Sequence, residues 1–242
     1  MTAWNVEWLD EIDSTNNELK RRMDAPHGTV LAARRQTGGK GRLGRSFCSP
    51  EGGVYLSVLL RPEVSPEHLM HLTAMAGVAT RRAIAAVSGI EAGIKWVNDL
   101  VYDGKKLCGI LVEWCGSAAI IGIGINCNTA DFPAELRAGA TSLRLLTGRE
   151  ISPDALANRL AQELRAMDAA LLTDRDAWLA EYAAHCVTLG KPVRLLRGGE
   201  DIGDAFAVGI DAQGGLRVRY DNGTEAIIRT GEVSVRGAEG YV

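Results

Sequence analysis

The segment from Gln36 to Arg45 is the stretch whose residue types most directly suggest chemistry, since it combines four glycines with three cations. Glycine lets backbone amides approach a bound anion closely, and Lys40, Arg42 and Arg45 can neutralise the charge of that anion. The composition therefore favours a phosphate or carboxylate ligand. The alternative for this loop taken alone is a solvated surface hairpin in which glycine serves only the turn geometry.

Three well-known phosphate-binding motifs do not fit this loop. Residues 39–44 satisfy G-x-G-x-x-G, but that pattern must open a helix, whereas Pro50 and Gly52 follow and the chain returns to a strand pattern. Lys40 is followed by Gly41, where a Walker A loop requires serine or threonine. A protein kinase would need the sequences H-R-D and D-F-G further on, and neither occurs.

The elements that must position this loop are strands and helices in irregular alternation. Hydrophobic periodicity and turn residues predict strands at 6–12, 29–33, 54–60, 94–97, 100–102, 107–114 and 120–125, and helices at 15–23, 65–88, 153–167 and 178–185. Thr15 and Glu18 fit a capping box that opens the first helix. The apolar run at 120–125 predicts a strand covered on both faces.

Composition bounds the class of protein. The chain has 242 residues, 46% hydrophobic and 24% charged, with a formal net charge of −3, which is typical of a globular protein. A broad nucleic-acid-binding face would need a basic excess, so duplex binding is disfavoured. Beyond Gly190, short strand-like runs separated by glycine-rich turns predict a small all-β barrel. We therefore expect two domains, residues 1–189 and 190–242.

The cysteines and the N-terminal residues indicate a cytoplasmic protein. Five cysteines without any C-x-x-C pair argue against a disulfide framework and a zinc site, and favour reduced, mostly buried thiols. Trp4, Glu7 and Asp10 lie where a signal peptide would need a basic start and an apolar run. No uninterrupted apolar stretch reaches the length of about 20 residues that a membrane helix requires.

Four separated motifs resemble the biotin protein ligase family in order and spacing. They are residues 12–16 (IDSTN), 39–45 (GKGRLGR), 95–100 with 106–113 (KWVNDL and KLCGILVE), and 122–128 (GIGINCN). Two positions depart from the residues usual in the family. Lys40 replaces an arginine and so loses the planar fork, while Val97 replaces a proline in a segment that we expect to be a strand without it. Agreement among several motifs is far more specific than the glycine loop alone.

The resemblance implies a fold and a domain plan. The family's fold is α+β, with a mixed central sheet and helices like those of class II aminoacyl-tRNA synthetases, followed by a small SH3-like β-barrel. Residues 1–189 would form the catalytic biotin- and ATP-binding domain, and residues 190–242 the barrel. Bifunctional members carry a DNA-binding domain ahead of the Ser-Thr-Asn motif. That motif begins at Ser14 here, so we expect a monofunctional ligase that does not bind DNA.

The reaction that the resemblance implies has two steps. The biotin carboxylate attacks the α-phosphate of ATP to give biotinyl-5′-adenylate and pyrophosphate, and a lysine amine of the acceptor then attacks the mixed anhydride. Because both partners of the first step are anions, catalysis depends on positioning and on neutralisation by fixed cations and Mg²⁺. The resemblance implies Lys95 and Arg42 as the catalytic residues, with Lys95 holding the carboxylate against the α-phosphate. Asn98 and Asp99 either hold magnesium or close the hairpin, so the metal ligands stay open.

The resemblance also assigns the binding residues. Biotin would be bound by Ser14, Thr15, Asn16, Gln36, Lys40, Gly41, Arg42, Lys95, Trp96, Gly109 and Leu111. ATP and the adenylate would be bound by Arg42, Arg45, Phe47, Lys95, Asn98 and Asn126. The alternatives are helix capping for Ser14 and Thr15 and core packing for Trp96.

Partners and rival functions follow from the same resemblance. The acceptor would be a biotin carboxyl carrier protein domain, and its docking can add a strand to an exposed sheet edge. The strand at 120–125 is a candidate edge for the acceptor or for a homodimer, and an interior strand is the alternative. One rival function is lipoate or octanoate transfer on a related fold. Another is a non-catalytic biotin-binding regulatory module that acts through the C-terminal barrel.

Overall fold

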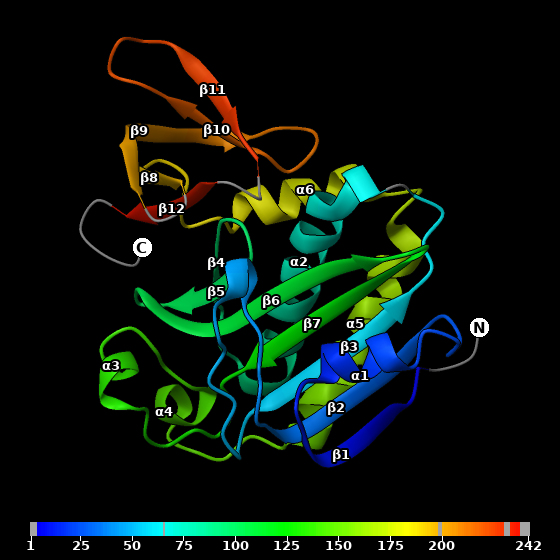
Figure 1. Ribbon diagram of the computed structural model, residues 1–242. Helices are drawn as coiled ribbons and strands as arrows, with labels where there is room; N and C mark the ends of the chain where they lie inside the picture. Colours follow the sequence, from blue (N-terminus) through cyan, green and yellow to red (C-terminus); the bar gives the residue numbers. More distant parts are fainter. Residues whose placement is uncertain (1–3, 65, 198–199, 230–232, 238–242) are drawn as a thin grey trace.

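A central β-sheet packed with helices is followed by a second, smaller sheet (Figure 1). The structure is a computed structural model that describes residues 4–64, 66–197, 200–229 and 233–237. The strands are β1 Val6–Ile12, β2 Thr29–Gln36, β3 Val54–Leu60, β4 Gly93–Lys95, β5 Asp99–Tyr102, β6 Lys105–Cys115, β7 Ala118–Ile125, β8 Pro192–Arg197, β9 Glu200–Ile210, β10 Leu216–Arg219, β11 Glu225–Ile228 and β12 Val233–Gly237. The α-helices are α1 Thr15–Arg21, α2 Leu69–Ser88, α3 Ala134–Arg137, α4 Leu143–Thr147, α5 Pro153–Ala170 and α6 Arg175–Ala184, with 3₁₀ turns at Arg42–Gly44 and Pro66–His68.

The larger sheet has the strand order β1-β2-β3-β7-β6-β5-β4. Strands β1 and β2 are parallel, and the other neighbours are antiparallel, so the mixed α+β sheet predicted from the sequence is confirmed. A parallel pair needs a crossover connection, and α1 lies in the one that joins β1 to β2.

This topology brings the sequence motifs to one end of the sheet. Ile12 pairs with Gln36 in the parallel register of β1 and β2, so the Ser-Thr-Asn motif and the glycine loop leave the sheet side by side. The loop then re-enters through β3, where Val54 pairs with Ile125 at the end of β7. Motifs that are more than a hundred residues apart in the chain therefore become neighbours.

Alternation of side chains along the strands separates a core face from a site face. Along β3, Leu56 lies in the large core formed with α2 and α5, whereas Ser57 contacts α1 on the opposite face. In the register of β3 with β7, Tyr55 lies opposite Gly124 and Ser57 opposite Gly122. The site face thus carries polar side chains beside glycines, which leaves room above the sheet.

The long helices cover the core face, and α1 covers the other (Figure 1). Four residues predicted to form the apolar stripe of α5 are buried: Leu156, Leu160, Leu164 and Met167. The hydroxyl of Ser152 accepts a hydrogen bond from the backbone N–H of Ala155, which confirms the predicted start of this helix. A smaller apolar cluster under α1 contains Leu19, Leu31, Leu59, Ala118 and Ile120.

The predicted capping box at the start of α1 is wrong. Ser14 precedes the helix, and the Thr15 hydroxyl turns inward to the hydroxyl of a buried residue on β3. The Glu18 carboxylate binds Arg21 and Arg22 on the surface instead of reaching back to the cap. Tertiary partners for Thr15 and ion partners for Glu18 replace the local cap.

Two strand predictions also need correction. Strand β7 pairs with both β3 and β6, so the suggestion that residues 120–125 form a docking edge is wrong and the interior alternative is confirmed. Strand β4 ends at Lys95, so Val97 lies in a turn, and the peptide bond between Trp96 and Val97 is cis. The Tyr182 hydroxyl donates to the Val97 carbonyl, which satisfies this backbone without a strand partner.

The smaller sheet is antiparallel, with the order β11-β10-β9-β8-β12. Within the described residues it is open, since β11 and β12 are its edges, and closure into an SH3-like barrel stays a prediction. All five cysteines are unpaired, and Cys108, Cys127 and Cys186 are buried, as predicted. No helix in the described part of the chain is long and apolar enough to span a membrane.

Candidate active site

Two cavities adjoin at the end of the sheet where the motifs meet. The first, here the cationic cavity, is lined by Lys40, Gly41, Arg42, Leu43, Arg45, Ser46, Phe47, Lys95, Trp96, Asn98, Asp99, Lys106, Gly109, Ile110 and Leu111. The second, the polar cavity, is lined by Ser14, Thr15, Asn16, Gln36, Lys40, Phe47, Tyr55, Gly109, Leu111, Gly122, Ile123 and Gly124. Every predicted site residue except Asn126 therefore lines one of the two cavities.

A chain of hydrogen bonds builds the polar cavity. The Ser57 hydroxyl donates to Asn16 Oδ1 at 2.6 Å, and the Thr15 hydroxyl lies 2.7 Å from the Ser57 hydroxyl and 3.2 Å from Gln36 Oε1. Gln36 Oε1 accepts from the backbone N–H of Thr15 at 2.9 Å, and Gln36 Nε2 donates to Ser49 Oγ at 3.0 Å. These contacts fix the orientation of the Asn16 and Gln36 side-chain amides, which can also form hydrogen bonds with a ligand.

Asn16 is held from the opposite side by a carboxylate. Its Nδ2 donates to Glu113 at 2.8 Å, and Lys20 pairs with the same carboxylate at 2.7 Å. A Cβ atom at Gly122 would lie only 2.1 Å from Asn16 Oδ1, so a residue with a side chain at this position would displace Asn16. Glycine at position 122 is therefore a requirement of the polar cavity.

The Phe47 ring forms the wall between the cavities and rests on glycines of two neighbouring strands. A Cβ atom at Gly124 would lie 2.6 Å from the ring, and one at Gly109 would lie 3.1 Å from it. Tyr55 meets the ring edge-on at 6.4 Å between centroids, and Lys106 Nζ lies 5.5 Å from the ring centroid. The missing side chains on β6 and β7 thus determine where the aromatic wall stands.

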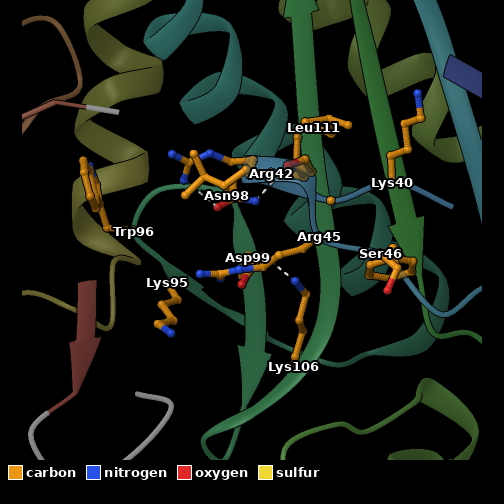
Figure 2. A pocket seen from close by; sticks show the side chains of 15 residues that line it. Lys40, Arg42, Arg45, Ser46, Lys95, Trp96, Asn98, Asp99, Lys106 and Leu111 are labelled. Atoms are coloured by element: carbon orange, nitrogen blue, oxygen red, sulfur yellow. Dashed lines mark hydrogen bonds and ion pairs between the residues drawn. The ribbon is translucent and has the colours of Figure 1, made fainter. Parts of the chain in front are cut away.

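The cationic cavity contains five cations and one carboxylate. Figure 2 shows Arg42, Arg45, Asp99 and Lys106 together at its centre, with Lys95 to one side. Arg42 donates to Asn98 Oδ1 at 3.2 Å, and Lys106 pairs with Asp99 at 2.8 Å. Burial lowers the pKa of Arg42, and Lys95 is only 4% exposed. An excess of partly desolvated positive charge suits a ligand with more than one anionic group.

Two predicted residues, Lys40 and Trp96, have contacts that their expected roles did not include. Lys40 Nζ donates to Asn17 Oδ1 at 2.8 Å, so this side chain points toward α1 and away from Arg42 (Figure 2). Trp96 lines the cationic cavity only, and its indole N–H donates to the carbonyl of Gly214 in the smaller sheet.

Asn126 lies outside both cavities. Its Nδ2 donates to the carbonyls of Thr141 at 3.0 Å and Lys106 at 3.3 Å, which ties the chain after β7 to β6. It lines a third cavity, here the side cavity, with Ser46, Phe47, Cys48, Lys106, Phe132, Glu135, Leu136, Gly139 and Ala140. Phe47 is therefore shared by all three cavities.

Sequence reasoning missed several residues that shape the site, among them Ser57, Lys106, Glu113 and Gly124. Ser57 had a usable signal, because it is the one serine inside an otherwise apolar strand. Lys106 and Glu113 stand in a motif that was recognised, but only the pairing of β6 with its neighbours shows which of its side chains share the site face.

Within the described ranges, no group of three or more His, Cys, Asp or Glu residues could hold a metal ion. Asn98 holds the hairpin, since its Nδ2 and carbonyl bond the backbone of Ile110 at 2.9 and 2.8 Å. Hairpin closure, one of the two roles predicted for Asn98, is thus confirmed.

Comparison with known proteins identifies the family of this chain. Residues 8–129 match the Biotin/lipoate A/B protein ligase family, and residues 188–236 match the Biotin protein ligase C terminal domain. The chain belongs to the Biotin/lipoate A/B protein ligase family.

Individual proteins are similar to this chain over most of its length. The chain is 34% identical over 242 residues to the biotin--[acetyl-CoA-carboxylase] ligase of Mycobacterium tuberculosis, covering 96% of this chain and 90% of that protein. It is 35% identical to the bifunctional ligase/repressor BirA of Bacillus spizizenii over 224 residues, 89% of this chain, and spans only 62% of that longer protein. The biotin protein ligase from Aquifex aeolicus in complex with biotin and ATP superposes with a TM-score of 0.88 at 32% identity, covering 97% and 99% of the two chains.

Protonation of Glu113 is expected to weaken the fold around the polar cavity. Burial raises the pKa of this carboxyl, but hydrogen bonds from Lys20 and Asn16 outweigh burial and leave the pKa below its usual value of 4.5. A group with a lowered folded-state pKa stabilises the protein above its unfolded pKa and loses that contribution as the pH falls. Glu113→Gln should therefore lower the free energy of unfolding by about 1 kcal/mol at pH 7 and flatten its decline below about pH 5.

Urea unfolding between pH 7 and pH 3 measures this effect. Glu225→Gln, which removes an exposed carboxylate paired with Arg217, is the matched control and should run parallel to the wild type. If the Glu113→Gln and wild-type curves were parallel as well, Glu113 would have no such role.

Proposed function

We propose that this protein is a biotin protein ligase, which activates biotin with ATP to biotinyl-5′-adenylate and transfers biotin to a lysine of biotin carboxyl carrier protein. The proposal rests on one observation: a cavity lined mainly by uncharged hydrogen-bonding groups adjoins a cavity lined by five cations, and Lys40 and Phe47 belong to both linings. Biotin has a neutral ureido head and a carboxylate tail, so it would span the two. The similarity to biotin ligases over nearly the whole chain supports the same conclusion.

The biotin head would lie in the polar cavity. A ureido group presents two N–H donors and one carbonyl acceptor, and Thr15, Asn16 and Gln36 supply oriented hydroxyl and amide groups. Ser57 and Glu113 hold these groups in place. The Phe47 ring and Leu111 would contact the apolar parts of the ligand.

The carboxylate and the α-phosphate would meet in the cationic cavity. Lys95 is the cation that would bridge them, because a compact ammonium can serve two oxygens of different groups. Arg42 and Arg45 would neutralise the phosphate, and Lys106 adds a fourth charge to the same wall. These cations reduce the repulsion between two negative reactants, and the walls exclude water from the mixed anhydride.

The adenine would occupy the side cavity. Phe47, Phe132 and Leu136 give it apolar walls, and Asn126 lies in its lining. Because Phe47 also borders the cationic cavity, an adenylate phosphate and its base can lie on either side of one ring. The predicted adenylate roles of Phe47 and Asn126 are compatible with this placement.

Magnesium is expected to accompany ATP. Mg²⁺ sites that use substrate phosphates need only one or two protein carboxylates, and Asp99 is the carboxylate in the lining of the cationic cavity, next to Asn98. Asp99 and Asn98 are thus the residues that would hold the ion, and the bound ion would neutralise phosphate charge.

The domain plan and the setting of the protein remain part of this proposal. Residues 1–189 would form the catalytic domain, and residues 190–242 would complete an SH3-like barrel. A homodimer stays a prediction, and any docking strand would need an edge other than β7. Use of ATP and the unpaired thiols support a cytoplasmic location.

Biotin-dependent exchange between ATP and pyrophosphate tests the activity. We expect exchange with biotin, none with lipoate or octanoate, and a biotin-sized mass gain on a purified carrier domain. Exchange with lipoate or octanoate alone would assign the protein to the rival transfer reaction. No exchange with any of the three acids would favour the non-catalytic binding module.

Loss of the Lys95 ammonium should slow the first step. We expect Lys95→Ala to reduce the rate of biotin-dependent exchange by about 10²-fold or more, because a fixed charge aimed at the reacting groups is lost. Biotin binding, measured by calorimetry, should be weakened but present. Lys105→Ala removes an exposed lysine of the neighbouring hairpin and should leave the rate unchanged. An unaltered rate in Lys95→Ala would remove Lys95 from the mechanism.

Biotin should order the glycine loop. Leu43 in this loop is 53% exposed, and trypsin can cut after Lys40, Arg42 and Arg45. We expect biotin to slow cleavage in residues 38–45, as closure over the ligand would protect these bonds. Cleavage after Arg149, an exposed residue remote from the loop, gives the reference rate. Equal loop cleavage with and without biotin would argue against closure.

A further inference from the structure

Trp96, the residue after Lys95, connects the active-site motif to the C-terminal sheet. Its indole Nε1–H donates to the carbonyl of Gly214 at 3.0 Å, and its backbone N–H donates to Thr188 Oγ1 at 3.0 Å. The side chain is buried. Both acceptors come from the part of the chain beyond residue 187, far from the catalytic motifs in sequence.

The Gly214 carbonyl belongs to a turn with a fixed shape. Asp211 Oδ1 accepts from the backbone N–H groups of Gln213 at 2.9 Å and Gly215 at 2.7 Å, and Arg229 pairs with the other oxygen at 3.0 Å. Gly214 has a φ of 84°, a left-handed conformation that favours glycine. The Asp211 carboxylate therefore determines the direction in which the carbonyls of this turn point.

A second donor from the larger part of the chain binds the same turn. His71 Nε2 lies 2.9 Å from the carbonyl oxygen of Ala212. A carbonyl can only accept, so Nε2 must carry the proton. His71 is buried in α2, which makes the turn a docked contact with two points of attachment.

The backbone on both sides of Lys95 is bound by the same C-terminal third of the chain. Ile94 donates to the His185 carbonyl and accepts from the backbone N–H of Val187, each at 2.9 Å. Tyr182 donates to the Val97 carbonyl at 3.1 Å. Strand β4 is only three residues long, so its own pairing with β5 gives Lys95 little support.

We propose that the turn Asp211–Gly215 of the C-terminal sheet positions Lys95 for adenylate formation, acting through Trp96. Asp211 and Trp96 are positioning residues, because neither has to touch the reacting atoms for this effect. A misplacement of about 1 Å at a catalytic group can reduce the rate about 10²-fold, so a small shift of this backbone is enough. The proposal rests on the proposed function of Lys95.

A wall of the biotin pocket is the competing role for Trp96. Trp96 is absent from the lining of the polar cavity, where the biotin head would lie, and its one polar side-chain atom is engaged by Gly214. The two roles differ in what they change. A wall residue affects the KM for biotin, whereas a positioning residue affects kcat.

Trp96→Phe and Asp211→Ala, alone and together, test the proposal by biotin-dependent pyrophosphate exchange. Trp96→Phe keeps an aromatic ring and loses the indole N–H. We expect each single variant to lower kcat about 10-fold, with the KM for biotin within about 2-fold of the wild type. The double variant should be no slower than the slower single variant, because both changes break one connection. Asp211→Asn, which keeps an oxygen acceptor, should recover most of the rate.

Trp114→Phe is the matched control, since it also removes an indole hydrogen bond to a glycine carbonyl, that of Gly116 at 2.8 Å, away from the site. Its kcat should equal that of the wild type. An unchanged kcat in Trp96→Phe, an additive double variant, or a raised biotin KM at unchanged kcat would each overturn the proposal.

Hydrogen exchange of the backbone separates this proposal from the proposed function. We expect Trp96→Phe and Asp211→Asn to be folded by circular dichroism, and amides of residues 94–98 to exchange faster in Trp96→Phe than in the wild type. If amides 94–98 were as protected in Trp96→Phe as in the wild type, the coupling of the C-terminal turn to Lys95 would be refuted. This result would hold whether or not the protein has biotin-dependent activity. A wild-type protein without biotin-dependent exchange would refute the proposed function as a biotin ligase. The hydrogen-exchange measurement would still show whether Trp96 holds the backbone around Lys95.

Discussion

Mutual repulsion among cations is the constraint on which the site depends. Arg42, Lys95 and Lys106 line one cavity with two further cations and a single carboxylate, and burial already lowers the pKa of Arg42. Charges of one sign stay together in a partly dry site only if the fold holds them there or an anion compensates them. Asp99 pairs with Lys106 and also stabilises the charge of Arg42, and the Asn98 oxygen accepts a hydrogen bond from Arg42. The remaining positive potential is what an anionic ligand would meet.

The larger sheet holds the site residues in place because its two faces have different roles. On the core face, apolar side chains from β2, β3, β6 and β7 pack against α2 and α5 and stabilise the strands. On the site face, Gly109, Gly122 and Gly124 remove the side chains that would otherwise fill the space above β6 and β7. Phe47 and Asn16 occupy that space in fixed positions, so an aromatic wall and an oriented amide stand beside the cations.

The C-terminal third of the chain contributes to this geometry without lining the polar cavity. Residues from Tyr182 to Gly214 bind the backbone around Lys95 and the Trp96 side chain. A sheet that looks separate in Figure 1 is therefore connected, through one turn, to the strand that bears the most buried cation of the site.

Periodicity predicted most strand and helix positions, and the resemblance of separated motifs predicted the mixed α+β fold, because both are local properties of the chain. All but one of the site residues predicted from that resemblance line the two main cavities, but several other lining residues were not predicted. The sequence by itself did not determine the interior place of β7, the inward turn of Thr15 or the second attachment of Trp96. Ser57, Glu113 and Gly124 acquire their roles only through register, since a cross-strand neighbour is decided by which strands pair. Local patterns state what a segment can form, whereas the competition between a local cap and a distant buried partner is decided only when the chain packs.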